Sequence, residues 1–204
     1  MLKKGLFITF EGADGCGKTT QINLLKEHLE NKGFEVLLTR EPGGAGLGVK
    51  LREILLNYDG EVSSKAEAFL FLADRAQNID VIVKPGIDAG KVVLCDRHTD
   101  STVAYQGYGR GVDLGQIKEL NLLATSGLRP DLTYVFDIDV ETSMARVGKV
   151  KDRMESAGVE FHNRVREGYL ALAKDEPERV KVINSADTIE NISAQVKAIF
   201  DAAH

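Results

Sequence analysis

Four residues near the N-terminus have the types and the spacing of a phosphate-binding loop. Gly12, Gly17, Lys18 and Thr19 follow the pattern G-x-x-x-x-G-K-T, between an apolar run and a segment with helical spacing. Glycines let backbone N–H groups converge on phosphate oxygens, and the start of a helix adds positive potential. The pattern predicts a nucleoside triphosphate site, and a glycine turn that arose by chance is the alternative.

A carboxylate follows another apolar run farther along the chain. Asp96 comes directly after "VVLC", at the carboxyl end of an expected strand, where open α/β sheets bind ligands. There it would hold Mg²⁺ through water, opposite Thr19. The alternative is an aspartate that caps the next helix.

These residues need a scaffold that brings strand ends together. Apolar runs separated by mainly helical patterns are typical of a parallel sheet covered on both faces. The expected strands are "GLFITFEG" (5–12), "FEVLLTR" (34–40), "KVVLCDR" (91–97), "LTYVFDID" (132–139) and "VKVIN" (180–184). The sequence predicts an α/β fold, a doubly wound parallel five-stranded sheet flanked by helices, in a single domain over 1–204. Capping boxes predict helix starts at Ser64, Asp113 and Asp187.

Composition excludes several classes of protein. The chain has 204 residues and a formal net charge of -5, which argues against a protein that coats nucleic acid. No apolar run reaches the roughly 20 residues needed to cross a bilayer, and the N-terminus does not have the pattern of a signal peptide. Cys16 and Cys95 lie too far apart for a Cys-x-x-Cys site. We therefore expect a cytoplasmic protein without a membrane or nucleic-acid partner.

A phosphate-binding loop does not define the reaction, so three interpretations compete. The stretch "NSAD" (184–187) is similar to the guanine reader of a nucleotide-binding switch, but Ser185 stands in place of the required lysine. Arg40, Arg75 and Arg97 favour an acceptor that already carries phosphate, because guanidinium groups bind phosphate bidentately. A deoxynucleoside kinase would instead need a carboxylate base for a neutral hydroxyl.

An ordered set of blocks resembles the thymidylate kinase family. The blocks are "FEGADGCGKTTQ", "TREPGG", "LFLADR", "DRHTDSTVAYQG" and "DRMESAGVEFHNRVREGYLALA". The resemblance implies a P-loop nucleoside monophosphate kinase fold, phosphorylation of dTMP to dTDP with ATP and Mg²⁺, and a homodimer. It implies that ATP binds at Gly12, Ala13, Asp14, Gly15, Cys16, Gly17, Lys18, Thr19, Thr20 and Arg146, with Thr19 and Asp96 as the metal residues.

The same resemblance assigns the acceptor site. It places Phe71 on the thymine ring and Arg75 near its O4, with Asp14 near the sugar 3'-hydroxyl and Tyr105 crowding the 2' position. The expected dTMP residues are Asp14, Arg40, Pro42, Phe71, Arg75, Arg97, Ser101, Tyr105 and Gln106. From the residues alone, Phe71 could instead belong to a helix core, and Arg40 could form a surface ion pair.

A cationic segment at about 146–158 resembles the lid of the bacterial type of this family, which supplies the catalytic arginine that the P-loop lacks. Arg153 is the expected transition-state cation, Lys149 and Lys151 add charge, and Arg146 borders the adenine. The expected catalytic set is Lys18, Arg97, Arg153, Asp14 and Asp96. The alternative for the segment is a solvated loop.

Overall fold

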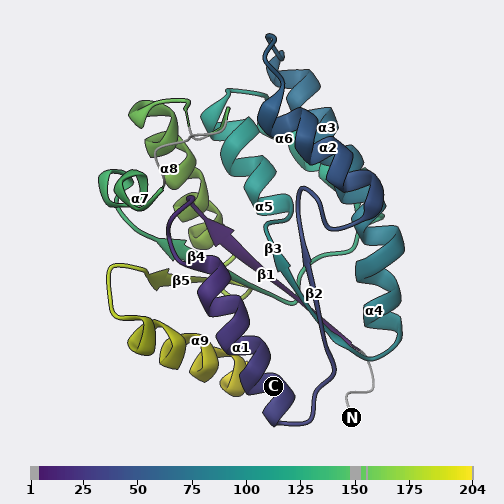
Figure 1. Ribbon diagram of the computed structural model, residues 1–204, viewed down its shortest axis with the longest axis vertical. Helices are drawn as coiled ribbons and strands as arrows, with labels where there is room; N and C mark the ends of the chain where they lie inside the picture. The colour runs from purple at the N-terminus through teal and green to yellow at the C-terminus, as the bar shows by residue number, and fades with distance from the viewer. Residues whose placement is uncertain (1–4, 148–152, 155, 204) are drawn as a thin grey trace.

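The five predicted strands form one parallel sheet. The computed structural model describes residues 5–147, 153, 154 and 156–203. The strands are β1 (Leu6–Gly12), β2 (Val36–Arg40), β3 (Val92–Asp96), β4 (Leu132–Asp137) and β5 (Val180–Asn184). They lie in the order β2-β3-β1-β4-β5, and every pair is parallel (Figure 1). The predicted α/β class and strand number are confirmed.

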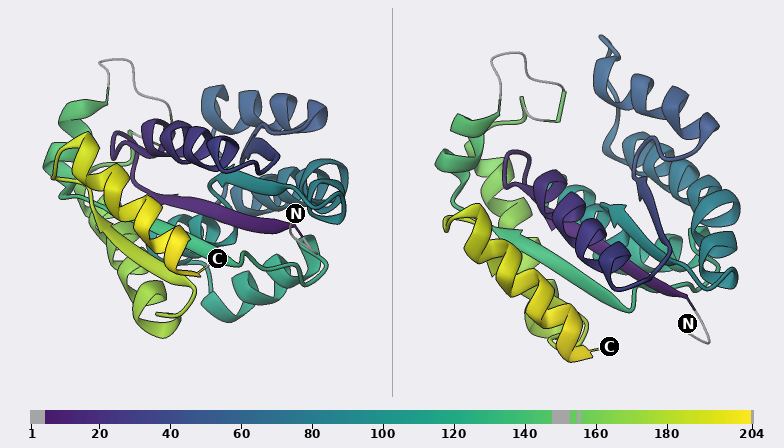
Figure 2. Two further views of the ribbon diagram at one scale, coloured as in Figure 1. Left: turned by 90° about the horizontal axis from the view of Figure 1, so that it is seen from below. Right: turned by 60° about the horizontal axis from the view of Figure 1, so that its bottom comes forward.

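Helices cover both faces of the sheet, as Figure 2 shows from two sides. Helices α1 (Lys18–Asn31) and α9 (Ile189–Ala203) pack together on one face, and α8 (Val159–Asp175) packs on the other against the π-helix η2 (Val103–Gly109). The remaining elements are α2 (Gly46–Asn57), α3 (Ser64–Asn78), the π-helix η1 (Ile79–Val83), α4 (Lys84–Asp88), α5 (Thr99–Thr102), α6 (Leu114–Ala124) and α7 (Val140–Arg146). No helix in these described ranges is long and apolar enough to cross a membrane.

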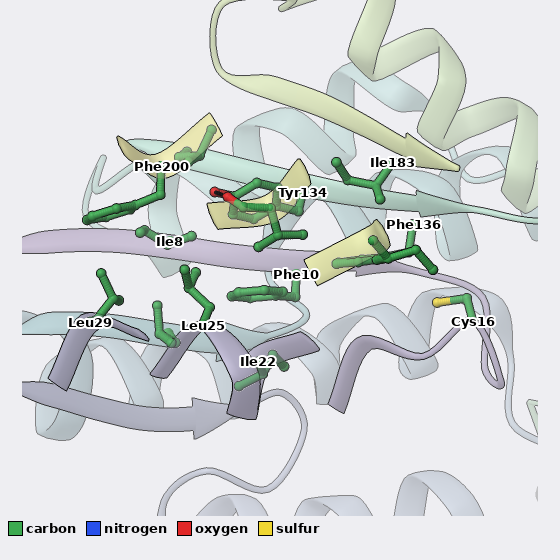
Figure 3. Packing of buried hydrophobic residues seen from close by; sticks show 14 of the residues in the cluster. Ile8, Phe10, Cys16, Ile22, Leu25, Leu29, Tyr134, Phe136, Ile183 and Phe200 are labelled. Carbon is green, nitrogen blue, oxygen red and sulfur yellow. Dashed lines mark hydrogen bonds between the residues drawn. The ribbon is translucent and has the colours of Figure 1, made fainter. Parts of the chain in front are cut away.

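Alternate strand residues supply two cores. Ile8 and Phe10 of β1 face α1 and α9, where they pack with Leu25 and Phe200 (Figure 3). Phe7, which comes directly before Ile8 and points to the opposite face of the strand, packs instead in a cluster with η1 and α4. A strand that is buried on both faces explains why the sequence of β1 is almost continuously apolar.

The carboxyl ends of the central strands meet at one edge. The register pairs Phe10 with Asp96 and Asp96 with Arg40, so the chain leaves β1, β2 and β3 at nearly the same level. Strand order reverses direction around β1, which is the position where open α/β sheets bind ligands. The P-loop, Arg40 and Asp96 are therefore brought together by the sheet.

Of the three predicted N-cap residues, one caps its helix and the other two are each one residue away from the cap that the structure shows. Asp113 accepts a hydrogen bond from the Gln116 amide at 2.9 Å, as expected of an N-cap. Helix α3 is capped by Ser63 and not by Ser64, and Thr188 accepts the Asn191 amide at the start of α9 in place of Asp187. Adjacent Ser, Thr and Asp residues are equally good caps, so the sequence does not separate them.

Candidate active site

The P-loop takes the shape that its glycines permit. Gly12, Gly15 and Gly17 have φ angles of 134°, 77° and 93°, a region that residues with side chains rarely adopt. The loop wraps around Lys18, whose Nζ donates to the carbonyl oxygens of Gly12 at 3.1 Å and Ala13 at 2.9 Å. The loop and its lysine are thus pre-organised as one unit.

A cavity of about 370 Å³ opens beside this loop. The expected ATP residues that line it are Asp14, Gly15, Gly17, Lys18, Thr19, Thr20 and Arg146. All the expected dTMP residues line it too, namely Arg40, Pro42, Phe71, Arg75, Arg97, Ser101, Tyr105 and Gln106 in addition to Asp14. One cavity therefore joins the P-loop to the predicted acceptor residues.

Three P-loop residues do not line the cavity with their side chains. Cys16 is only 2% exposed, and its side chain joins the core beneath α1, near Phe136 (Figure 3). Gly12 and Ala13 also lie outside the lining. The roles of these three residues in binding ATP therefore stay predictions.

Arg97 is the center of the acceptor side. Its φ angle of 72° is unusual for a residue with a side chain. Its Nη2 donates to Asp14 Oδ1 at 2.7 Å and to the Tyr105 hydroxyl at 3.3 Å. Its Nη1 donates to Ser101 Oγ and to the Tyr169 hydroxyl, both at 3.2 Å. Four partners fix the guanidinium in one orientation.

The Asp14 carboxylate carries a full negative charge beside Arg97. Burial would raise its pKa, but the charges of Arg97 and Lys18 outweigh burial and hold the pKa well below the usual range. Asp14, expected near the sugar 3'-hydroxyl, is thus paired with Arg97, another of the expected dTMP residues. Ser101, also expected to bind dTMP, lies beside Arg97 as well, and the roles of all three stay predictions.

Glu11 supports Arg97 from beneath, although the sequence did not single it out. The side chain is fully buried and accepts hydrogen bonds from Ser101 Oγ at 2.6 Å, the His98 amide at 2.8 Å and the Tyr169 hydroxyl at 3.3 Å. Burial and the charge of Asp100 raise the pKa of Glu11 to about 7. Glu11 therefore orients two of the hydroxyl groups that hold the guanidinium.

Arg75 lies in a second buried network. It is 1% exposed, and its Nε donates to Glu41 Oε2 at 2.8 Å. Nη1 donates to Thr102 and Asn121, both at 2.7 Å, and Nη2 donates to the His98 carbonyl at 2.9 Å. These bonds use four of its five N–H groups, and no described residue accepts the fifth, on Nη2.

Glu41 keeps this network charged. Burial would raise its pKa, but the charges of His98 and Arg75 outweigh burial and lower the pKa to about 2. His98 Nδ1 lies 3.0 Å from Glu41 Oε1, and Asn78 donates to the same oxygen at 3.0 Å. An ionised pair without access to water fixes the position of Arg75.

The mouth of the acceptor side is formed by α2 and α3. Phe71, one turn before Arg75, is only partly buried and lines the cavity. Arg40 is exposed at the end of β2. Arg52 of α2 was not predicted, yet it lines the cavity and donates to the Pro42 carbonyl at 3.0 Å.

The predicted metal residues fit Mg²⁺. Asp96 Oδ1 is buried and receives no hydrogen bond from any described residue, while Thr19 is exposed at the second position of α1. Both line the cavity. Within the described ranges no three His, Cys, Asp or Glu residues form a metal cluster. One carboxylate and one hydroxyl are the few protein ligands that Mg²⁺ needs when phosphates complete its shell.

Arg153, the predicted lid arginine, is bound to α2 and α3. Arg153 Nη1 donates to Glu67 Oε2 at 2.5 Å and Nε to the Leu55 carbonyl at 2.9 Å, and Arg153 does not line the cavity. Lys149 and Lys151 lie outside the described residues. Arg146 is exposed at the cavity and donates to the Ser185 carbonyl at 3.3 Å.

Three functional candidates escaped prediction from the sequence. Glu11 had a usable signal, because a charge inside a buried apolar strand needs partners. Arg52 and Tyr169 had none, since an arginine on a helix and a tyrosine in an amphipathic helix are ordinary. The partner of Arg52, Pro42, precedes α2 by a few residues, and Arg97 is 72 positions from Tyr169, so neither contact follows from the spacing of one helix.

A P-loop at the end of the central strand, a buried arginine network next to it and one shared cavity define a P-loop nucleoside monophosphate kinase. The thymidylate kinase family model matches residues 10–196, and the chain belongs to that family.

Named relatives cover nearly the whole chain. A thymidylate kinase of Desulfovibrio desulfuricans is 46% identical over 97% of this chain and 95% of its own, and one of Clavibacter michiganensis is 49% identical over 95% and 93%. The crystal structure of thymidylate kinase from Ehrlichia chaffeensis superposes with a TM-score of 0.82, at 37% identity, over 96% of this chain and 98% of that one.

Proposed function

We propose that this protein transfers the γ-phosphoryl group of ATP to dTMP, giving dTDP and ADP, within a single kinase domain. The observation that carries the proposal is one cavity in which the P-loop and the Arg97–Asp14 pair, 2.7 Å apart, face the same space. Membership of the thymidylate kinase family does not favour a deoxynucleoside kinase or a nucleotide switch.

Arg97 and Arg40 bind the dTMP phosphate in this proposal. A phosphate oxygen is already anionic at neutral pH, so the attack needs alignment and charge screening and no general base. Arg97 supplies both, because Asp14, Ser101 and Tyr169 hold its guanidinium in place. Arg40, exposed at the end of β2, adds a second cation that adjusts to the phosphate.

The thymine ring stacks on Phe71 and meets Arg75. The remaining Nη2 proton of Arg75 is a donor for thymine O4, whereas cytosine offers an amino donor at that position. Tyr105, which is 6% exposed, crowds the ribose 2' position, and Asp14 accepts from the 3'-hydroxyl. A buried polar match of this kind rejects the wrong base strongly.

The donor side uses Lys18 and the P-loop amides for the ATP phosphates. Thr19 and Asp96 hold Mg²⁺, which supplies charge neutralisation for the β and γ phosphates when bound. Arg146 borders the adenine. Arg153 acts as the transition-state cation of a lid at about 146–158, which requires that it leave Glu67 and Leu55.

An acceptor panel tests the proposal. ADP formation is measured with MgATP and dTMP, dUMP, dCMP, AMP, GMP or thymidine. Strong preference for dTMP is expected. Preference for thymidine would move the protein to the nucleoside kinases, and ADP release without any acceptor would indicate an ATPase or a switch.

A homodimer is proposed on the face formed by α2, α3 and α6. Helix α2 packs on α3 and α3 packs on α6, at the upper right of Figure 1. Large apolar side chains are exposed there: Leu47, Val49, Ile54, Phe69, Leu122 and Leu123. Apolar patches of this kind mark protein interfaces.

Leu123→Glu is expected to yield a monomer in analytical ultracentrifugation. Val182→Glu, on exposed β5, is the control, and a dimeric Leu123→Glu variant would contradict this interface.

A cytoplasmic location also stays a proposal. Cys16 and Cys95 are both buried and unpaired, as is usual in reducing compartments. Fractionation of cells that express the tagged protein would test it.

A further inference from the structure

Glu67 is a buried carboxylate that holds three side chains. It lies in the first turn of α3 and is 1% exposed. Its Oε1 accepts from Gln106 Nε2 at 2.9 Å and from Arg110 Nε at 3.1 Å. Its Oε2 accepts from Arg110 Nη2 at 3.2 Å and from Arg153 Nη1 at 2.5 Å. Both oxygens of this carboxylate are therefore surrounded by donors.

The surroundings of Glu67 keep it ionised. Burial would raise its pKa, but hydrogen bonds from Arg110 and Gln106 and the charge of Arg110 outweigh burial, so the pKa is lowered. Protonation of Glu67 would leave the positive charges of Arg110 and Arg153 without a negative partner, which also favours the ionised form. An ionised carboxylate has no proton to donate and can only accept.

Because ionised Glu67 can only accept hydrogen bonds, it determines the orientation of the Gln106 amide. Only the amide nitrogen can donate to Glu67, so the amide oxygen must point away from it. Gln106 lines the cavity together with Arg75, and no described residue donates to Gln106 Oε1. Gln106 Oε1 is thus an acceptor, and the fifth N–H of Arg75 a donor, without a partner among the described residues, and both side chains line the same cavity.

A donor and an acceptor in the same cavity match one edge of thymine. Thymine presents O4 as an acceptor and N3–H as a donor, while cytosine presents an amino donor and a bare N3 acceptor. If the Gln106 amide were turned by half a rotation, its NH₂ group would face the base and match N3 of cytosine.

We propose that Glu67 is a positioning residue for base specificity, which fixes the Gln106 amide with its oxygen toward the acceptor base. The inference rests on the proposed function, because it takes dTMP as the acceptor. Glu67 itself does not line the cavity and acts through Gln106.

Glu67→Gln tests this role, because glutamine has the same shape but both donates and accepts. The Gln106 amide then has no fixed orientation. The ratio of kcat/KM for dTMP to that for dCMP is expected to fall by about tenfold or more, the worth of one misplaced hydrogen bond in a buried site. Glu53→Gln, the same substitution at a carboxylate whose side chain is 68% exposed, is the matched control, with an unchanged ratio.

A double-mutant cycle separates action through Gln106 from a general structural effect. Gln106→Met is expected to lower the same ratio, and Glu67→Gln combined with Gln106→Met is expected to lower it no further. Additive losses would overturn the inference. Loss of folding affects all nucleotides alike and does not change the ratio.

Removal of the carboxylate leaves two arginines uncompensated, and Glu67→Gln alone could fail to fold for that reason. The double variant Glu67→Gln/Arg110→Gln removes one negative and one positive charge together. Its ratio of kcat/KM for dTMP to that for dCMP is expected to fall in the same way. If the wild type prefers dTMP and the variants retain that preference within twofold, the inference is overturned while the proposed function stands. If the wild type does not phosphorylate dTMP, both fail.

Discussion

The two sides of the cavity are built by different means. The donor side comes from one short stretch, 12–20, whose glycines and lysine adopt their geometry locally. The predicted acceptor side takes side chains from β2, α3, the residue after β3, α5 and η2, and contacts such as Arg75–Glu41 and Arg97–Tyr169 of α8 hold them. The difference shows that the conformation of the P-loop is encoded by a local stretch of backbone, whereas the side chains that face it across the cavity are held by long-range pairing.

The largest expected effect is on the donor side. Lys18→Met removes the cation that lies inside the P-loop, and kcat is expected to fall by at least about 10³-fold, since charge stabilisation dominates phosphoryl transfer. ADP release with saturating dTMP measures it. Lys26→Met, on the exposed face of the same helix where Lys26 pairs with Glu30 at 3.2 Å, should be silent. A Lys18→Met variant with a tenth of the wild-type rate would contradict the donor assignment.

The next effect concerns stability on the acceptor side. Glu41→Gln leaves the charge of Arg75 buried and uncompensated, and the free energy of unfolding is expected to fall by about 3–5 kcal/mol. Urea denaturation followed by circular dichroism measures the loss. Glu53→Gln is the control, because the Glu53 side chain is 68% exposed. A loss no greater than in this control would mean that side-chain pairing does not hold the acceptor side.

Arg97→Ala sharpens the comparison by its effect on each substrate. The variant is expected to lose about 10² in kcat/KM for dTMP, while the KM for ATP changes little, because Arg97 contacts acceptor-side groups. Steady-state kinetics with each substrate varied in turn gives both values. Arg129→Ala, 65% exposed, is the control. An equal rise of both KM values would place Arg97 between the two sides.

The smallest effect is the opposite pH dependence of two buried glutamates. The pKa of Glu11 rises from 4.5 to about 7 on folding, so the native state binds more protons in that interval and its stability falls as pH rises through it. The pKa of Glu41 falls from 4.5 to about 2, so the stability that it contributes is present above 4.5 and is lost as pH falls toward 2.

Thermal unfolding across pH tests these signs. Glu11→Gln is expected to flatten the decline between pH 4.5 and 7, and Glu41→Gln to flatten the decline toward acid. Wild-type melting temperatures that rise from pH 4.5 to 7 by the same amount in Glu11→Gln would contradict the assignment for Glu11.

The sequence predicted the fold well because its signals are local. Each strand was placed within two residues, since apolar runs bounded by polar residues define strands directly. The P-loop was predicted for the same reason. The pairing of Arg75 with Glu41 was not, because the two residues are 34 positions apart and only the fold brings them together.

Irregular helix geometry was also beyond prediction. Tyr105 and Gln106 lie in the π-helix η2, where one added residue per turn changes which side chains face the cavity. No residue type marks such a turn in the sequence. The resemblance to the family named both residues, but the partner of Gln106, Glu67, emerged only from the structure.

One backbone contact ties Arg97 to the strand that leads into the P-loop. The Arg97 amide donates to the Phe10 carbonyl at 2.9 Å, and Phe10 lies two residues before the first P-loop glycine. The backbone of Arg97 and the strand that leads into the P-loop are therefore held at the spacing of adjacent strands, about 4.8 Å. The sheet itself thus sets how far Arg97 lies from the P-loop.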